Sequence, residues 1–116
     1  MKDRVKCRKG LPCSFTVRFE AGIGAQYTEA KFQVRDEFGE SSTLRLEATH
    51  ADGITITPGT PGIVEISIGA TKTEQMEELS AERVMAAELR LYDPNNADDR
   101  MGAPIPFVYL PEAIDD

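Results

Sequence analysis

The residues with the greatest capacity for chemistry lie in an oxygen-rich run near the C-terminal end of the chain. The run contains Asp93, Asn95, Asn96, Asp98 and Asp99. Calcium takes carboxylate and amide oxygens at alternating positions, but this run lacks the central glycine and the later bidentate glutamate of a helix-loop-helix calcium site. Asp and Asn are also common at hairpin tips, because their side chains bond the neighbouring backbone. We therefore interpret the run as a turn and expect no metal and no cofactor.

The two cysteines form a second candidate site. Cys7 and Cys13 are too close together, and too near the N-terminus, to be the framework of a disulfide-dense fold. We predict two reduced cysteines at a strand start in a protein made in the cytosol, with a Cys7–Cys13 disulfide as the alternative. A zinc site is less favoured, because two thiols and the single His50 cannot complete the usual four ligands.

Nucleophilic catalysis would need a base beside a serine or cysteine, and His50 is the one histidine in the chain. It lies in residues 49–53, which we predict to be an exposed turn. The sequence has neither a glycine-rich phosphate loop nor a basic-aromatic patch. We predict that the protein is not an enzyme and that it has no catalytic, cofactor-binding or metal-binding residues.

Basic residues are concentrated at the start of an acidic chain. The candidate assembly interface consists of Lys2, Arg4, Lys6, Arg8 and Lys9. Against Asp3 alone they give residues 1–10 a charge of +4, which leaves −11 for the rest of a chain whose net charge is −7. The acidic body repels phosphate, so we expect no nucleic-acid partner. The arm is either a solvated edge strand or a segment that docks on an acidic neighbour, and the sequence favours neither.

Length and hydropathy favour one domain outside the membrane. The chain has 116 residues, 41% of them hydrophobic, and we assign residues 1–10 to an extended basic arm and residues 11–116 to a single domain. No apolar run is long enough to cross a bilayer, and no apolar segment follows the charged start. We expect a soluble protein with no membrane partner.

The elements that must position these residues are strands, because apolar and polar side chains alternate along most of the chain. Period-two alternation is typical of strands with one buried face and one solvent-exposed face. It predicts strands at 14–19, 31–35, 43–49, 54–57, 63–68, 83–92 and 103–110. We expect one core formed by Phe15, Val17, Phe19, Phe32, Val34, Leu44, Leu46, Ile54, Ile56, Val64, Ile66, Ile68, Leu89, Leu91 and Phe107.

Three local signals refine this pattern. Thr71 and Glu74 have the spacing of a capping box, and with Met76 and Leu79 they predict one short helix over 71–79. Residues 83–92 are also good helix formers, but a hairpin to the next run favours a strand. Two prolines in 103–110 place the first half of that run at an edge or outside the sheet, after a long hairpin loop.

The order of these elements resembles a group of small tailed-phage virion proteins with an immunoglobulin-like β-sandwich domain. The resemblance is carried by Lys9-Gly10-Leu11-Pro12-Cys13-Ser14-Phe15-Thr16-Val17, Ala30 to Arg35, Leu44 to Thr49, Asp52 to Ile56, Ile63 to Ile68, the capped Thr71 helix, and the final Leu89 to Pro94 and Phe107 to Glu112. It implies an all-β, immunoglobulin-like antiparallel sandwich of about seven strands with one short helix. The chain departs from the group at Leu11, Pro12 and Cys13, where small polar residues are usual.

The same resemblance implies a function in assembly. The leading hypothesis is a non-enzymatic component of the tail, neck or baseplate, or a fibre adaptor, that joins other virion structural proteins as a symmetric homo-oligomer. Such a protein would be made and assembled in the host bacterial cytoplasm and would reside in the virion. The alternatives are a capsid decoration protein and a cell-surface or glycan-binding module, although exposed aromatics for a sugar are few.

Overall fold

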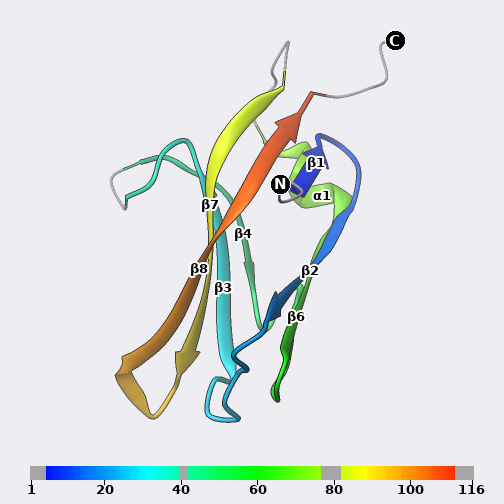
Figure 1. The fold of residues 1–116 in the computed structure, drawn as a ribbon. Helices are drawn as coiled ribbons and strands as arrows, with labels where there is room; N and C mark the ends of the chain where they lie inside the picture. The colour runs from blue at the N-terminus through cyan, green and yellow to red at the C-terminus, as the bar shows by residue number, and fades with distance from the viewer. Residues whose placement is uncertain (1–4, 40–41, 77–81, 112–116) are drawn as a thin grey trace.

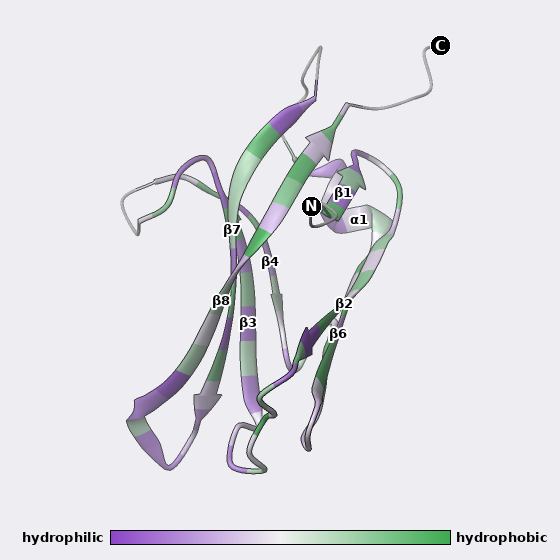
Figure 2. Cartoon of the chain, in the orientation of Figure 1, coloured by the Kyte–Doolittle hydropathy of each residue, from purple (hydrophilic) through white to green (hydrophobic). Residues whose placement is uncertain are grey.

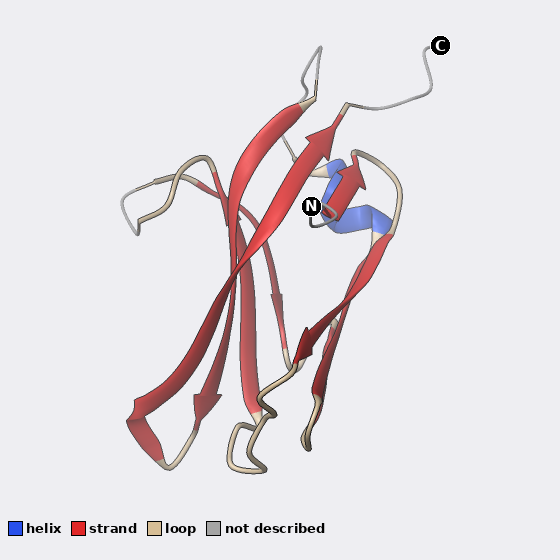
Figure 3. Ribbon diagram, viewed as in Figure 1, coloured by secondary structure: helices blue, strands red, loops and turns tan. Residues whose placement is uncertain are grey.

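The computed structural model describes residues 5–39, 42–76 and 82–111, and most of them lie in strands (Figures 1 and 3). The elements in chain order are β1 Val5–Arg8, β2 Cys13–Phe19, β3 Glu29–Arg35, β4 Leu44–Thr49, β5 Ile54–Thr57, β6 Gly62–Ile68, α1 Ala70–Glu74, β7 Arg83–Asp93 and β8 Asn96–Leu110. The alternative of a helix over residues 83–92 is excluded, because β7 is a continuous strand.

The strands form two facing sheets. The large sheet has the order β1-β8-β7-β3-β4 and the small sheet the order β2-β6-β5. The arrangement β8-β7-β3-β4 against β2-β6-β5 is that of the G-F-C-C′ and B-E-D strands of an immunoglobulin sandwich. The predicted all-β sandwich with one short helix is confirmed, with eight strands in the described part of the chain and one parallel pair, β1 with β8.

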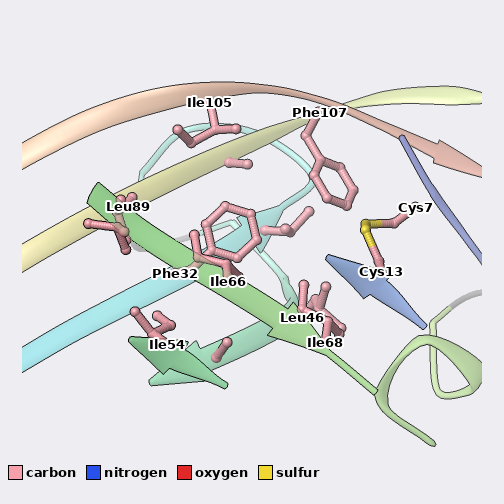
Figure 4. Close-up of a cluster of buried hydrophobic side chains, with 14 of the residues drawn as sticks. Cys7, Cys13, Phe32, Leu46, Ile54, Ile66, Ile68, Leu89, Ile105 and Phe107 are labelled. Carbon is pink, nitrogen blue, oxygen red and sulfur yellow. A yellow bond between two sulfur atoms is a disulfide. The ribbon is translucent and has the colours of Figure 1, made fainter. Parts of the chain in front are cut away.

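Hydrophobic and hydrophilic residues alternate along the strands (Figure 2), and the buried side chains pack between the sheets, as the alternation predicts (Figure 4). Phe32 is fully buried at its centre, with its ring centroid 5.3 Å from that of Phe15 and 6.2 Å from that of Phe107. Of the predicted core residues, all except Leu44 are buried or pack against the buried cluster. The cluster also contains Ile23 and Tyr109, which the prediction omitted.

Leu44 is 41% exposed, which corrects the predicted core. The register between β3 and β4 shifts, because Val34 pairs with Leu46 whereas the next residue, Arg35, pairs with Leu44. The bulge leaves Arg45 as an extra residue and turns Leu44 away from the core. Arg45 donates two hydrogen bonds to Asp36, at 2.9 and 2.8 Å, and these bonds lower the pKa of the Asp36 carboxyl.

Helix α1 begins without the predicted capping box. Its N-cap residue is Gly69, which provides no side-chain hydrogen bond, and Thr71 lies inside the helix and is exposed. Thr73 is buried instead: its hydroxyl accepts a hydrogen bond from Gly10 N–H (3.1 Å) and donates one to the Leu11 carbonyl (2.9 Å). Helix α1 is therefore attached to the turn between β1 and β2. The rest of the predicted helix, including Leu79, lies outside the described residues.

Strand β8 is continuous through both prolines. Strand β1 pairs only with residues 107–110, so Pro104 and Pro106 lie where β7 is the one partner of β8 in the described structure. Their predicted position at an edge is confirmed, since proline has no N–H to donate to a further strand. The expected long loop is wrong. Asp93 pairs with Asn96 across a two-residue turn, and residues 97–99 form a bulge before Arg100 pairs with Tyr92.

Cys7 and Cys13 form a disulfide, so the prediction of two reduced cysteines is wrong. Both residues are buried, and a turn at Gly10, whose φ is 84°, returns the chain from β1 to β2. The Cα atoms are consequently 5.4 Å apart, which is within bonding range. The bond connects the large sheet to the small one and fixes β1 in the sandwich (Figure 4).

Candidate functional site

The basic arm is partly incorporated into the fold. Lys2 and Arg4 lie outside the described residues, and Lys6 is exposed on β1. Arg8 Nη1 donates a hydrogen bond to the Pro111 carbonyl (2.8 Å). Lys9 Nζ donates to the Glu74 and Met76 carbonyls, the latter at 2.9 Å, at the C-terminal end of α1. Of the candidate interface, Lys6 therefore faces solvent, whereas Arg8 and Lys9 hold neighbouring segments of their own chain.

A second surface, which the sequence did not indicate, is the outer face of the large sheet. The face is hollowed to about 270 Å³ where β3 and β7 run side by side. It is lined by Lys31, Gln33, Arg35, Glu37, Phe38, Gly39, Ala86, Glu88, Arg90 and Tyr92. We call this feature the outer hollow. Its members on β3 and β7 alternate with core residues, so their outward direction was predictable, but their pairing across strands was not. The other members, Glu37, Phe38 and Gly39, come from the loop after β3.

Hydrogen bonds connect polar side chains on both strands of the outer hollow. Gln33 Nε2 donates to Glu47 Oε2 (2.6 Å), and Arg35 Nη2 donates to Gln33 Oε1 (3.3 Å). Arg90 Nε donates to Glu88 Oε1 (2.9 Å), and the charge of Glu88 raises the pKa of Arg90. These contacts link polar side chains within the β3–β4 pair and within β7.

Lys31 and Arg90 lie directly opposite each other in the β3–β7 register. Like charges at directly opposed positions destabilise a sheet. The ion pair with Glu88 balances the charge of Arg90. The Lys31 ammonium has no hydrogen-bond or ion-pair partner in the described part of the chain. The outer hollow thus contains one cation that the fold itself does not balance.

Removal of the Lys31 charge is expected to stabilise the isolated domain. In Lys31→Gln the opposition to Arg90 disappears, so the free energy of unfolding should rise by about 0.2 to 1 kcal/mol. Denaturant titration at low and high salt would measure the change, which should shrink as salt screens the charges. Lys31→Arg keeps the charge and is the matched control. A loss of stability in Lys31→Gln would contradict the repulsion.

The oxygen-rich run forms the tip of the β7–β8 hairpin, where three of its side chains accept hydrogen bonds. Asp93 Oδ1 accepts a hydrogen bond from Asn95 N–H (2.8 Å), and Asn96 Oδ1 accepts one from Asp98 N–H (3.1 Å). Asp99 accepts a hydrogen bond from the Tyr27 hydroxyl, which raises the pKa of that phenol. The described residues contain no cluster of His, Cys, Asp and Glu arranged to hold a metal ion.

His50 lies in an exposed turn, as predicted. Its Nδ1 accepts a hydrogen bond from Ala30 N–H at 3.3 Å. This contact attaches the β4–β5 turn to β3 and gives the ring a structural role.

The fold and these surfaces define a small immunoglobulin-like sandwich with a charged outer face. Comparison with protein-family models, curated proteins and solved structures gave no significant match. Within the described residues, no helix has both the length and the hydropathy required to cross a bilayer. The function is therefore argued from the surfaces themselves.

Proposed function

We propose that this protein is a non-enzymatic virion component of a tailed phage, located in the tail, neck or baseplate or serving as a fibre adaptor. It assembles with other virion structural proteins as a symmetric homo-oligomer and binds neither nucleic acid nor membrane. The observation that carries the proposal is the edge strand β1, which exposes Lys6 and continues a basic N-terminal segment on an otherwise acidic body. Complementary charge of this kind determines which surfaces meet and in what register.

Two further features support a role in assembly. The resemblance of the element order to small virion proteins extends over nearly the whole chain. The Cys7–Cys13 disulfide fixes β1 against the sandwich, so the exposed Lys6 side chain is presented from a rigid support. Disulfides persist in oxidising surroundings, which suits a particle that is released from the cell.

A second candidate, a module that binds a cell-surface glycan, is favoured by one observation. Phe38, 68% exposed, and Tyr92 both line the outer hollow among polar side chains. Sugars commonly stack on exposed aromatic rings. Binding of neutral oligosaccharides that is lost in Phe38→Ala and Tyr92→Ala would support this function and disfavour a purely structural one. A capsid decoration protein remains within the first class and would use the same basic edge.

The basic arm is expected to matter for assembly more than for folding. Replacement of Lys2, Arg4, Lys6 and Arg8 by serine should leave the domain folded but prevent its incorporation into particles. Replacement of Arg8 also removes its hydrogen bond to the Pro111 carbonyl. A second variant therefore changes only Lys2, Arg4 and Lys6, so that this contact within the chain is kept. Melting temperature and particle composition would be measured for both variants, with Arg18→Ser, a charge lost from the small sheet, as control. Normal incorporation without these charges would show that the arm is only a solubilising edge.

A further inference from the structure

The outer hollow and the tip of the β7–β8 hairpin carry opposite charges. The outer hollow contains Lys31, Arg35 and Arg90 against Glu37 and Glu88, so its formal charge is +1 in a chain of −7. The tip, residues 93–100, contains Asp93, Asp98 and Asp99 against Arg100, so its formal charge is −2. Figure 2 shows the tip as a mostly hydrophilic end of the hairpin formed by the two longest described strands, β7 and β8.

Each of these surfaces contains a charge of its own net sign that has no partner in the described structure. In the outer hollow it is Lys31, opposite Arg90 and without a partner in the described structure. At the tip, the carboxylates of Asp93 and Asp99 accept hydrogen bonds from Asn95 and Tyr27. The Asp98 carboxylate has no such contact within the described ranges, and the residue is exposed in the bulge.

The tip is built to present Asp98 in a fixed place. The hydrogen bond from Asp98 N–H to Asn96 Oδ1 and that from Arg100 Nη2 to the Ala97 carbonyl (2.9 Å) shape the bulge. A preorganised loop loses little conformational entropy when it binds. Pro104 has no N–H to donate, so it disfavours main-chain pairing of a further strand with this edge of β8. The hairpin is therefore available for contact through the side chains of its tip.

We propose that the hairpin tip of one copy docks in the outer hollow of a second copy, with Asp98 paired to Lys31. The outer hollow, with a volume of about 270 Å³, is large enough to receive the Asp98 side chain. The two surfaces are different, so the contact is heterologous and propagates from copy to copy as a ring or a filament. The contact does not use the basic strand β1 and stands independently of the virion assignment.

The test is the oligomeric state of the purified full chain by analytical ultracentrifugation across salt concentrations. We expect self-association at low ionic strength, where charges act over about 30 Å, and its loss toward physiological salt, where they act over about 8 Å. Lys31→Gln and Asp98→Asn should each abolish it. Arg18→Gln and Glu65→Gln, which remove one charge of either sign from the small sheet, should not. Melting temperatures would show that every variant is folded.

A mixture of the two variants tests the pairing of tip and outer hollow most directly. Lys31→Gln keeps an intact tip and Asp98→Asn keeps an intact outer hollow, so an equimolar mixture has one working contact. The mixture should form a 1:1 dimer and nothing larger, although neither variant associates alone. A monomeric wild type at low salt, or self-association that persists in both variants, would overturn the proposal. Association lost only on replacement of Lys6 would assign the contact to β1 and would also overturn it.

Discussion

Replacement of Phe32 by alanine is expected to lower the free energy of unfolding by about 3 to 5 kcal/mol. Phe32 has no exposed surface and contacts aromatic rings from β2 and β8, so its removal leaves a cavity between the sheets that neither sheet can close. Small domains are stable by only about 5 to 15 kcal/mol, so the variant should be near its folding limit. Denaturant titration followed by circular dichroism would measure the loss.

Strand β4 provides a matched pair of controls for this prediction. Leu46 is 4% exposed and Leu44 is 41% exposed, although both belong to the same alternating pattern. Leu46→Ala should cost about 2 to 5 kcal/mol, whereas Leu44→Ala should cost much less, because the bulge has turned Leu44 outward. Equal losses at the two positions would show that the register shift is absent.

Replacement of Thr73 by valine is expected to cost about 1 to 3 kcal/mol. Valine preserves the shape of the buried side chain but cannot accept from Gly10 N–H or donate to the Leu11 carbonyl. The turn between β1 and β2 would then lose its attachment to α1. The free energy of unfolding and the hydrogen-exchange protection of the Gly10 amide would both be measured.

Thr71→Val is the control for this hydrogen-bond network. Thr71 is exposed in the same helix and provides no cap, so this change should alter stability by less than about 0.5 kcal/mol. A larger loss of stability in Thr71→Val than in Thr73→Val would support the predicted capping box. It would also contradict the hydrogen-bond network assigned to Thr73.

The sequence predicted the architecture well because burial follows period two wherever a strand is regular. In β6 and β7 the predicted inward residues are all buried, including Val64, Ile66, Leu89 and Leu91. The pattern was wrong at Leu44 because a bulge changes the face of a strand without changing its composition. It was also wrong at Thr71, because Thr73 satisfies backbone groups of a turn that is remote in sequence.

The candidate site was less predictable than the fold. Alternation shows that Lys31 and Arg90 point outward, but only the register places them opposite each other. The cysteines were misjudged for a related reason. Their spacing alone does not reveal a tight turn between two strands that places both thiols on inward positions. In each case the deciding quantity was a pairing between segments, which a single sequence does not display.

The parallel pairing of β1 with β8 has a consequence for the order of synthesis. The hydrogen bond from Arg8 to the Pro111 carbonyl joins residues 103 positions apart, and non-local contacts of this kind slow folding. The ribosome releases β1 early, whereas its partner, residues 107–110, follows about a hundred residues later. Until then the large sheet lacks both β8 and β1, and β1 has no strand with which to pair. A nascent chain therefore cannot complete the β1 edge of the large sheet before β8 has been made.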